Sequence, residues 1–170
     1  HYRAKVLLKP APLPHNNTKR NHYKDASSEL SKVPPGQEPK GGPTGGALKQ
    51  SESKDWYWLE DDIIFLCAMN VPWASHDSCF APGVGMRGDG IDLVIIRKTN
   101  RWRLLTTFMS MDTGAHTKLP FVEFYKVDAF CLIPETGSEI VLAGETAGPL
   151  QPALVTSHPD SLKCYYTAQP

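Results

Sequence analysis

Hydrophobic and polar positions along the chain predict a series of short strands and one helix. Apolar runs rich in β-branched residues occur at 63–69 and 91–97, and their length and composition are typical of buried strands. Shorter apolar or alternating segments predict further strands at 2–8, 121–125, 127–133, 139–142 and 163–166. Most gaps between these strands are too short for crossover helices, which favours antiparallel pairing. We therefore expect a mainly β domain, an antiparallel two-layer β-sandwich with one flanking helix.

The segment 101–116, RWRLLTTFMSMDTGAH, predicts that helix. Leu104, Phe108 and Met111 recur at i, i+4 and i+7, so they share one helical face. Gly114 stands where a helix stop is expected. The spacing alone fits a plain core helix equally well.

Residues 15–54 interrupt the pattern with clustered proline and glycine, and Tyr23 is their one aromatic residue. Such a stretch buries too little apolar surface to offset its ordering entropy. We expect a disordered insertion that acts as a spacer rather than as a regulatory segment. The predicted organisation is a first strand within 1–14, the insertion at 15–54 and the rest of the β domain at 55–170.

The net charge of the chain is zero, because 18 Lys and Arg balance 18 Asp and Glu. This balance argues against nucleic acid as a partner and against strong electrostatic attraction to an anionic membrane. The chain begins at His1, inside a strand pattern and without methionine, so we expect it to be part of a longer protein. The chain has four cysteines and no CxxC pair: Cys67, Cys79, Cys131 and Cys164. We expect them to be buried free thiols, which are typical of proteins in a reducing cytosol.

Several polar motifs resemble functional sites but have ordinary structural interpretations, and we expect no metal site. Gly88-Asp89-Gly90 precedes a strand, whereas a phosphate-binding loop opens a helix, so a tight turn is favoured. Asp92 starts a strand, lacks EF-hand spacing and is expected to be structural. Asp61-Asp62 fits a solvated acidic turn better than a catalytic carboxylate pair. His116 has no nucleophile partner in the linear order, and a lone histidine is more often structural.

Residues 104–116, LLTTFMSMDTGAH, match the pattern LLRLFLAMEKGxH. Further matches follow in the same order as in that pattern's family: YRAKVLLKP at 2–10, a tryptophan-led strand entry at 56–65, FAP at 80–82, AFCLIP at 129–134, AGE at 143–145 and HP at 158–159. These segments resemble the C-terminal half of a sphingosine kinase, within the diacylglycerol-kinase-like lipid kinase superfamily. The insertion at 15–54 has no counterpart in the core pattern.

This resemblance implies an ATP-dependent kinase that phosphorylates the primary hydroxyl of sphingoid bases and gives sphingosine 1-phosphate. The nucleotide-binding domain and the catalytic acid would lie in the half that this chain lacks, so the chain alone should be inactive and no catalytic residue is assigned to it. ATP and Mg²⁺ would be bound mainly there, with Gly144 and Glu145 reaching the nucleotide from this side. Ala143 stands where the family has an acidic residue, and we hypothesise that Ala143→Asp would raise the full-length protein's turnover or ATP affinity.

The resemblance also implies an apolar pocket in the β domain for the sphingoid tail, whose CH₂ groups contribute roughly 0.8 kcal/mol each when buried. It further implies a peripheral membrane surface as a partner, a cytoplasmic location and a homodimer formed through the missing domain. The substrate-binding residues that it implies are Leu104, Phe108, Met111, His116, Val122, Val94 and Phe80.

Two other functions stay open on the sequence. A catalytically silent lipid-binding or scaffold module would keep the same β domain, and a kinase relative acting on ceramide or diacylglycerol would need a wider pocket. Without the resemblance, the same apolar side chains fit ordinary core packing. An intact ATP-binding motif in the preceding sequence would separate a kinase from a silent module.

Overall fold

The computed structural model describes residues 2–13, 23–34, 37, 39, 55–84, 90–134, 140–142, 145–146 and 152–157. Its main feature is a six-stranded antiparallel sheet made of β1 (Tyr2–Pro10), β2 (Ser31–Lys32), β3 (Tyr57–Met69), β6 (Ile91–Arg97), β7 (Val122–Pro134) and β10 (Ala153–Thr156). Around it lie α2 (Ala26–Glu29), β4 (Trp73–Ser75), β5 (Ser78–Cys79), α3 (Arg101–Met109), η1 (Ala115–Lys118), β8 (Val141–Leu142) and β9 (Glu145–Thr146). The predicted mainly antiparallel β architecture with a flanking helix is confirmed.

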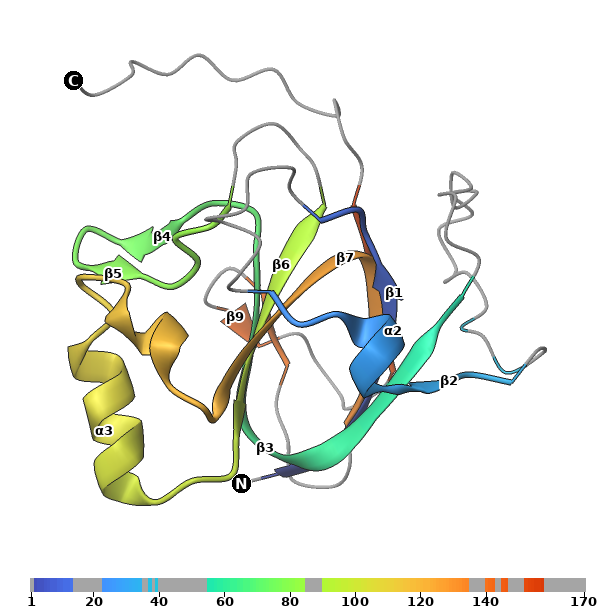
Figure 1. Ribbon diagram of the computed structural model, residues 1–170, viewed down its shortest axis with the longest axis horizontal. Helices are drawn as coiled ribbons and strands as arrows, with labels where there is room; N and C mark the ends of the chain where they lie inside the picture. Colours follow the sequence, from blue (N-terminus) through green and yellow to red (C-terminus); the bar gives the residue numbers. More distant parts are fainter. Residues whose placement is uncertain are drawn as a thin grey trace, which may run out of the picture.

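The main sheet closes on itself. β1 pairs with both β3 and β7, and β6 pairs with the other halves of those two strands. β3 and β7 contain 13 residues each, so each is long enough to run through both halves of the sheet. The two predicted layers are therefore two halves of one closed sheet rather than two separate sheets (Figure 1).

Closure gives the sheet an inner face and an outer face, and successive side chains of each strand alternate between them. The inner cluster contains side chains from β1, β3, β6 and β7, among them Val6, Leu59, Leu93 and Val127. A second cluster covers the outer face where β3, β6 and the start of β7 meet, and α3 lies beside it. A third cluster covers the outer face of β1 and the end of β7.

Most predicted strands are confirmed, but their limits differ. β6 has the predicted limits, whereas β3 begins at Tyr57 instead of 63. The two strands predicted at 121–125 and 127–133 are one strand, β7, because Lys126 between them is buried against Asp92 and does not end the strand. β10 was not predicted, because it follows a proline-rich stretch. The strand expected at 163–166 lies outside the described residues.

The prediction of disorder throughout 15–54 is wrong for residues 23–34. These residues form α2 and β2, and β2 pairs with β3. Tyr23 supplies the reason: its side chain is buried and its hydroxyl donates a 2.5 Å hydrogen bond to the Asp92 carboxylate. The other residues of the segment lie outside the described part, except for Gln37 and Pro39.

The cysteines that the structure describes carry free thiols, as predicted. Cys79 and Cys131 are buried and Cys67 is half-buried, while Cys164 lies outside the described residues. Burial raises the pKa of all three described thiols, which makes them poor nucleophiles. In the described part of the chain, every helix is too short or too polar to cross a membrane.

Candidate functional site

The helix α3 is fixed at its beginning by a side-chain cap. The Asn100 side-chain oxygen Oδ1 accepts a 2.8 Å hydrogen bond from the Arg103 backbone N–H, which satisfies one of the free donors at the helix start. Inside the helix, Thr107 is fully buried and its hydroxyl donates to the Arg103 carbonyl. Leu104 and Phe108 lie on the same side and reach the outer cluster.

The helix ends earlier than its apolar spacing predicts. α3 stops at Met109, so Met111 lies in the following turn and does not share the helical face of Leu104 and Phe108. Met111 is nevertheless buried in the outer cluster, and its backbone carbonyl accepts a 2.9 Å hydrogen bond from the Cys79 N–H. Gly114 has a φ of 70°, and this left-handed conformation lets the chain turn directly into η1.

The structure brings all seven predicted substrate-binding residues to one place. Val94, Met111 and Val122 are buried members of the outer cluster, and Leu104 and Phe80 pack against it. Phe108 meets Phe65 edge-on at a ring-centroid distance of 6.4 Å, and Phe65 in turn meets Phe80 at 5.6 Å. His116 packs against Phe124 at 5.9 Å. We call these seven residues, together with Phe65 and Phe124, the α3 cluster.

The motif comparison missed Phe65 and Phe124. Both lie on the outer face of the sheet, Phe65 in β3 and Phe124 in β7, two residues after Val122. The alternation of side chains along a strand was the available signal: once Val122 is assigned to a site, Phe124 belongs to the same face.

His116 is the one titratable side chain in the α3 cluster, and its burial is complete. Its Nε2 lies 2.9 Å from the Phe80 carbonyl oxygen, so we assign the ring proton to Nε2, which then donates to that carbonyl. Burial lowers the pKa of His116, although the carbonyls of Phe80 and Ser110 oppose this shift. A neutral ring is therefore favoured at neutral pH.

The second ring nitrogen of His116, Nδ1, forms no hydrogen bond with the described residues. Nδ1 is buried, and the Ser110 carbonyl is close enough to the ring to raise the pKa of His116. With the proton on Nε2, Nδ1 is an acceptor. The α3 cluster thus gathers mostly buried apolar side chains around one buried acceptor nitrogen.

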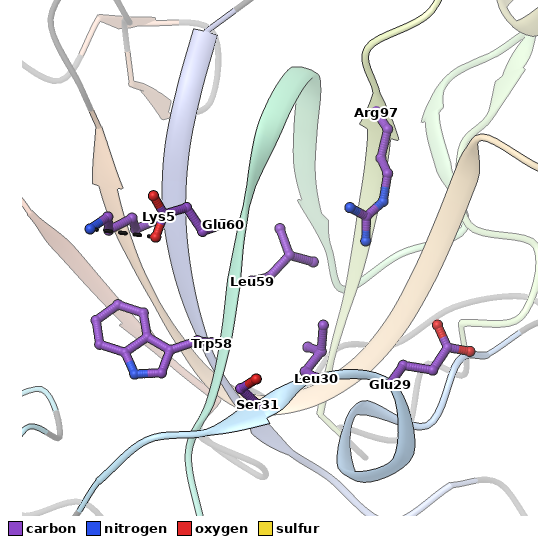
Figure 2. Close-up of a pocket in the computed structure, with 8 residues that line it drawn as sticks. All are labelled: Lys5, Glu29, Leu30, Ser31, Trp58, Leu59, Glu60 and Arg97. Atoms are coloured by element: carbon purple, nitrogen blue, oxygen red, sulfur yellow. Dashed lines mark ion pairs between the residues drawn. The ribbon is translucent and has the colours of Figure 1, made fainter.

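A separate cleft of about 550 Å³ lies at the mouth of the closed sheet, between β3, β6 and α2 (Figure 2). Its charged side chains are already neutralised by protein partners: Lys5 pairs with Glu60 at 3.5 Å, and Arg97 forms two 2.9 Å hydrogen bonds to Glu123. A charged ligand would have to displace these partners. The residues that line the cleft, none of which belongs to the α3 cluster, are Lys5, Glu29, Leu30, Ser31, Trp58, Leu59, Glu60 and Arg97.

The acidic motifs have structural roles in this fold. Asp92 is buried between Lys126, at 2.8 Å, and Tyr23, so it holds an internal ion pair as its strand position predicts. Asp61 pairs with Arg97, and Asp62 pairs with Lys98 at 3.0 Å. Each of the two adjacent carboxylates has its own cation, which does not fit a shared catalytic pair; they also lie within β3 instead of a turn.

The predicted nucleotide-side residues are only partly described. Glu145 is an exposed residue of β9, while Gly144, Ala143 and the HP step at 158–159 lie outside the described residues. Within the described part, no three His, Cys, Asp or Glu side chains gather closely enough to hold a metal ion. One exposed carboxylate is too small a donor set for Mg²⁺ and ATP, so the described residues alone do not form a nucleotide site.

The chain is similar to two curated proteins of Arabidopsis thaliana, sphingosine kinase 1 and sphingosine kinase 2. In each case it is 26% identical over 133 residues, which is 78% of this chain and 26% of the relative. No family model matches the chain. The similarity supports the resemblance to sphingosine kinases that the motifs predict, and the chain spans about a quarter of the length of the curated relatives it matches.

Proposed function

We propose that this chain is the lipid-binding part of an ATP-dependent sphingosine kinase, and that the α3 cluster binds the sphingoid base. The observation that carries this proposal is the convergence of the α3 cluster. Its seven predicted members come from five separate segments: the loop at 80, β6, α3 with its turn, η1 and β7. The similarity to sphingosine kinases over 78% of the chain supports the same function.

The chemistry of the cluster suits a single-chain amino alcohol. Leucine, valine, phenylalanine and the flexible Met111 bind an alkyl tail without any charge, and the tail gains free energy with each CH₂ removed from water. The unpartnered Nδ1 of His116 accepts a hydrogen bond from a hydroxyl or ammonium group of the same ligand. In this proposal the chain binds and orients the lipid and excludes water from its tail.

The reaction itself belongs to the longer protein. ATP supplies the γ-phosphate, and the residues that bind ATP and Mg²⁺ lie mainly outside this chain, with Glu145 as the described contribution from this side. This division explains why the chain needs no catalytic residue of its own. A silent lipid-binding module would bind the same lipid, so kinase activity of the longer protein with an intact ATP-binding domain separates the two functions.

Two matched valine substitutions test the proposal. Val94 belongs to the α3 cluster and Val6 to the inner cluster, and both side chains are fully buried in the same sheet. We expect Val94→Ala to weaken sphingosine binding by the longer protein about 3-fold to 10-fold, and Val6→Ala to leave it unchanged. Thermal unfolding should report a similar loss of stability in both variants.

Equal effects of the two substitutions on sphingosine affinity would contradict the proposal. A lipid panel then decides the substrate class: sphingosine and its saturated analogue should bind, whereas two-tailed ceramide and diacylglycerol should not. Preference for a two-tailed lipid would favour the ceramide or diacylglycerol kinase alternative.

A further inference from the structure

The α2–β2 segment, residues 23–34, lies at the mouth of the closed sheet but is not part of its ring (Figure 1). The ring is formed by pairing among β1, β3, β6 and β7, whereas β2 adds only two residue pairs at the start of β3. Ala26 and Leu30 of the segment pack on the inner cluster, and Val33 packs on the third cluster. The hydrogen bonds that close the ring therefore do not involve the segment.

Two consecutive side chains of the segment bind carboxylates of two neighbouring strands. The Tyr23 hydroxyl donates a 2.5 Å hydrogen bond to Asp92 of β6, and the Lys24 ammonium donates one of 2.8 Å to Glu123 of β7. The Lys24 backbone N–H also donates to the Phe124 carbonyl at 2.8 Å. The ring thus recognises a tyrosine followed directly by a lysine.

Both carboxylates also have a cation that belongs to the ring itself. Asp92 binds Lys126 at 2.8 Å, and Glu123 accepts two 2.9 Å hydrogen bonds from Arg97. If the segment leaves, each carboxylate keeps this cation and water replaces the donors of the segment. Release therefore leaves no unpaired buried charge, which is the costly outcome in a protein interior.

The segment does not fill the space beside it. The cleft of about 550 Å³ lies between the segment and the ring, with Glu29, Leu30 and Ser31 on one side and Leu59 and Arg97 on the other (Figure 2). The contact is therefore incomplete along this edge, unlike the close packing of the inner cluster. We call the surface of the ring under the segment and beside this cleft the segment groove.

The connections to the segment are long enough for it to reach a neighbouring molecule. Residues 14–22 precede it and residues 35–54 follow it. The shorter connection has a maximum span of about 30 Å, from its length and the extended rise of a peptide chain. This span is similar to the diameter of a small domain.

We propose that the segment groove is a peptide-docking site, and that residues 23–34 are its tethered ligand, which the same segment of a second copy can replace. The recognition elements are the hydroxyl of Tyr23, the ammonium of Lys24 and the apolar side chain of Leu30, seven positions after the tyrosine. Tethering gives the chain's own segment an effective concentration on the order of millimolar, so it occupies the groove in dilute protein. This proposal goes beyond the proposed function, because it involves neither lipid nor nucleotide.

A labelled peptide of residues 21–34 tests the groove, with fluorescence anisotropy of its binding to the full chain as the measurement. We expect Tyr23→Phe/Lys24→Gln in the chain to strengthen peptide binding at least about 10-fold, because the chain's own segment then competes less. The same two changes in the peptide should weaken its binding to this variant at least about 10-fold. One pair of substitutions thus has opposite effects on the two sides of the interaction.

Two controls keep this test specific. Lys98→Gln removes an exposed lysine of the ring whose partner is Asp62, and it should leave peptide binding as in the wild type. A peptide with the same composition in scrambled order should not bind. Peptide affinity that is equal in the wild type and in Tyr23→Phe/Lys24→Gln, or equal for the scrambled peptide, would overturn the proposed groove.

Sedimentation of the full chain tests exchange between copies. We expect the wild type to be a monomer at micromolar concentration and to form a dimer as its concentration approaches the millimolar range. Tyr23→Phe/Lys24→Gln should remain a monomer, because its segment binds neither groove. A wild type that stays monomeric throughout, or a dimer that this variant retains, would overturn replacement by a second copy.

Discussion

His116 is a buried histidine whose neutral form is favoured by the fold. Burial lowers its pKa, while the unfolded chain keeps a value of about 6.5. As the pH falls through 6.5, the unfolded state gains a proton that the folded state resists. The contribution of neutral His116 to the stability of the fold is therefore complete above pH 6.5. It is lost as the pH falls toward the lowered pKa that His116 has in the folded state.

We predict that this residue makes the free energy of unfolding fall by up to about 1.4 kcal/mol per pH unit in that window. Urea unfolding from pH 8 to about pH 5 measures the slope. His116→Gln should flatten it, and His76→Gln, on an exposed turn, should leave it as in the wild type. If the free energy of unfolding depends on pH as strongly in His116→Gln as in the wild type, another group causes the dependence.

The buried pair of Asp92 and Lys126 is the second residue-scale feature, since each side chain is 1% exposed. Removing one partner leaves the other charge buried without compensation, and we predict that Asp92→Asn lowers the free energy of unfolding by about 3–5 kcal/mol. The exposed pair of Asp62 and Lys98 is the control, because Asp62→Asn should cost less than about 1 kcal/mol. Chemical unfolding compares the two, and equal costs would refute a structural role specific to Asp92.

At the scale of elements, Tyr23 is one of the tertiary anchors of the segment that forms α2 and β2, beside the pairing of β2 with β3. The hydroxyl of Tyr23 would lie 2.7 Å from a Cβ added to Gly83, so the loop at Gly83 and the segment 23–34 fit closely. We predict that Gly83→Ala displaces Tyr23 and exposes the α2–β2 segment to protease. Tyr23→Phe should cost about 1–3 kcal/mol, because a buried acceptor on Asp92 loses its donor.

Limited proteolysis followed by mass spectrometry measures this effect. The first cuts in Gly83→Ala should fall within 23–34, whereas Pro82→Ala, at the neighbouring exposed position, should keep the wild-type pattern. Wild-type protection of this segment in Gly83→Ala would mean that Tyr23 does not anchor it.

Helices and strands whose own residues strongly favour one secondary structure were predictable from the sequence. β6 was found with its limits because a run of β-branched and leucine residues favours a strand and Gly90 precedes it with a φ of 110°. The short elements α2 and β2 were missed because their residues have weak local preferences and depend on Tyr23, which contacts residues 69 positions away. The end of α3 was misplaced because Met111 is buried by the turn rather than by helical spacing.

The candidate site was predictable only in part. Motif resemblance selected seven residues that the structure groups together, although periodicity alone links only Leu104 and Phe108. Phe124 follows from Val122 by alternation along β7, whereas the contribution of Phe65 depends on the pairing of β3 with β6, which no local pattern specifies. The exposed face of α3 could not be identified from the sequence. Trp102 and Leu104 are both apolar, and only the solvent accessibility of their side chains shows that Leu104 faces the protein and Trp102 does not.

At the scale of the whole molecule, closure of the sheet places two buried clusters on opposite faces, and we propose that only the outer one binds lipid. The inner cluster connects all four strands of the closed ring and holds the fold together. The outer cluster beside α3 rests on that frame, so its side chains can be shaped for a ligand without interrupting the strand pairing.

The central claim, that the α3 cluster holds a sphingoid tail, is tested most directly by photocrosslinking. A sphingosine analogue with a photoreactive group near the end of its tail is irradiated with the longer protein, and the labelled peptides are sequenced. We expect labels on α3, on the turn with Met111 and on the loop with Phe80, and unlabelled sphingosine should compete with them. Labels on the cleft around Leu59 and Arg97, or no label that sphingosine competes, would contradict it.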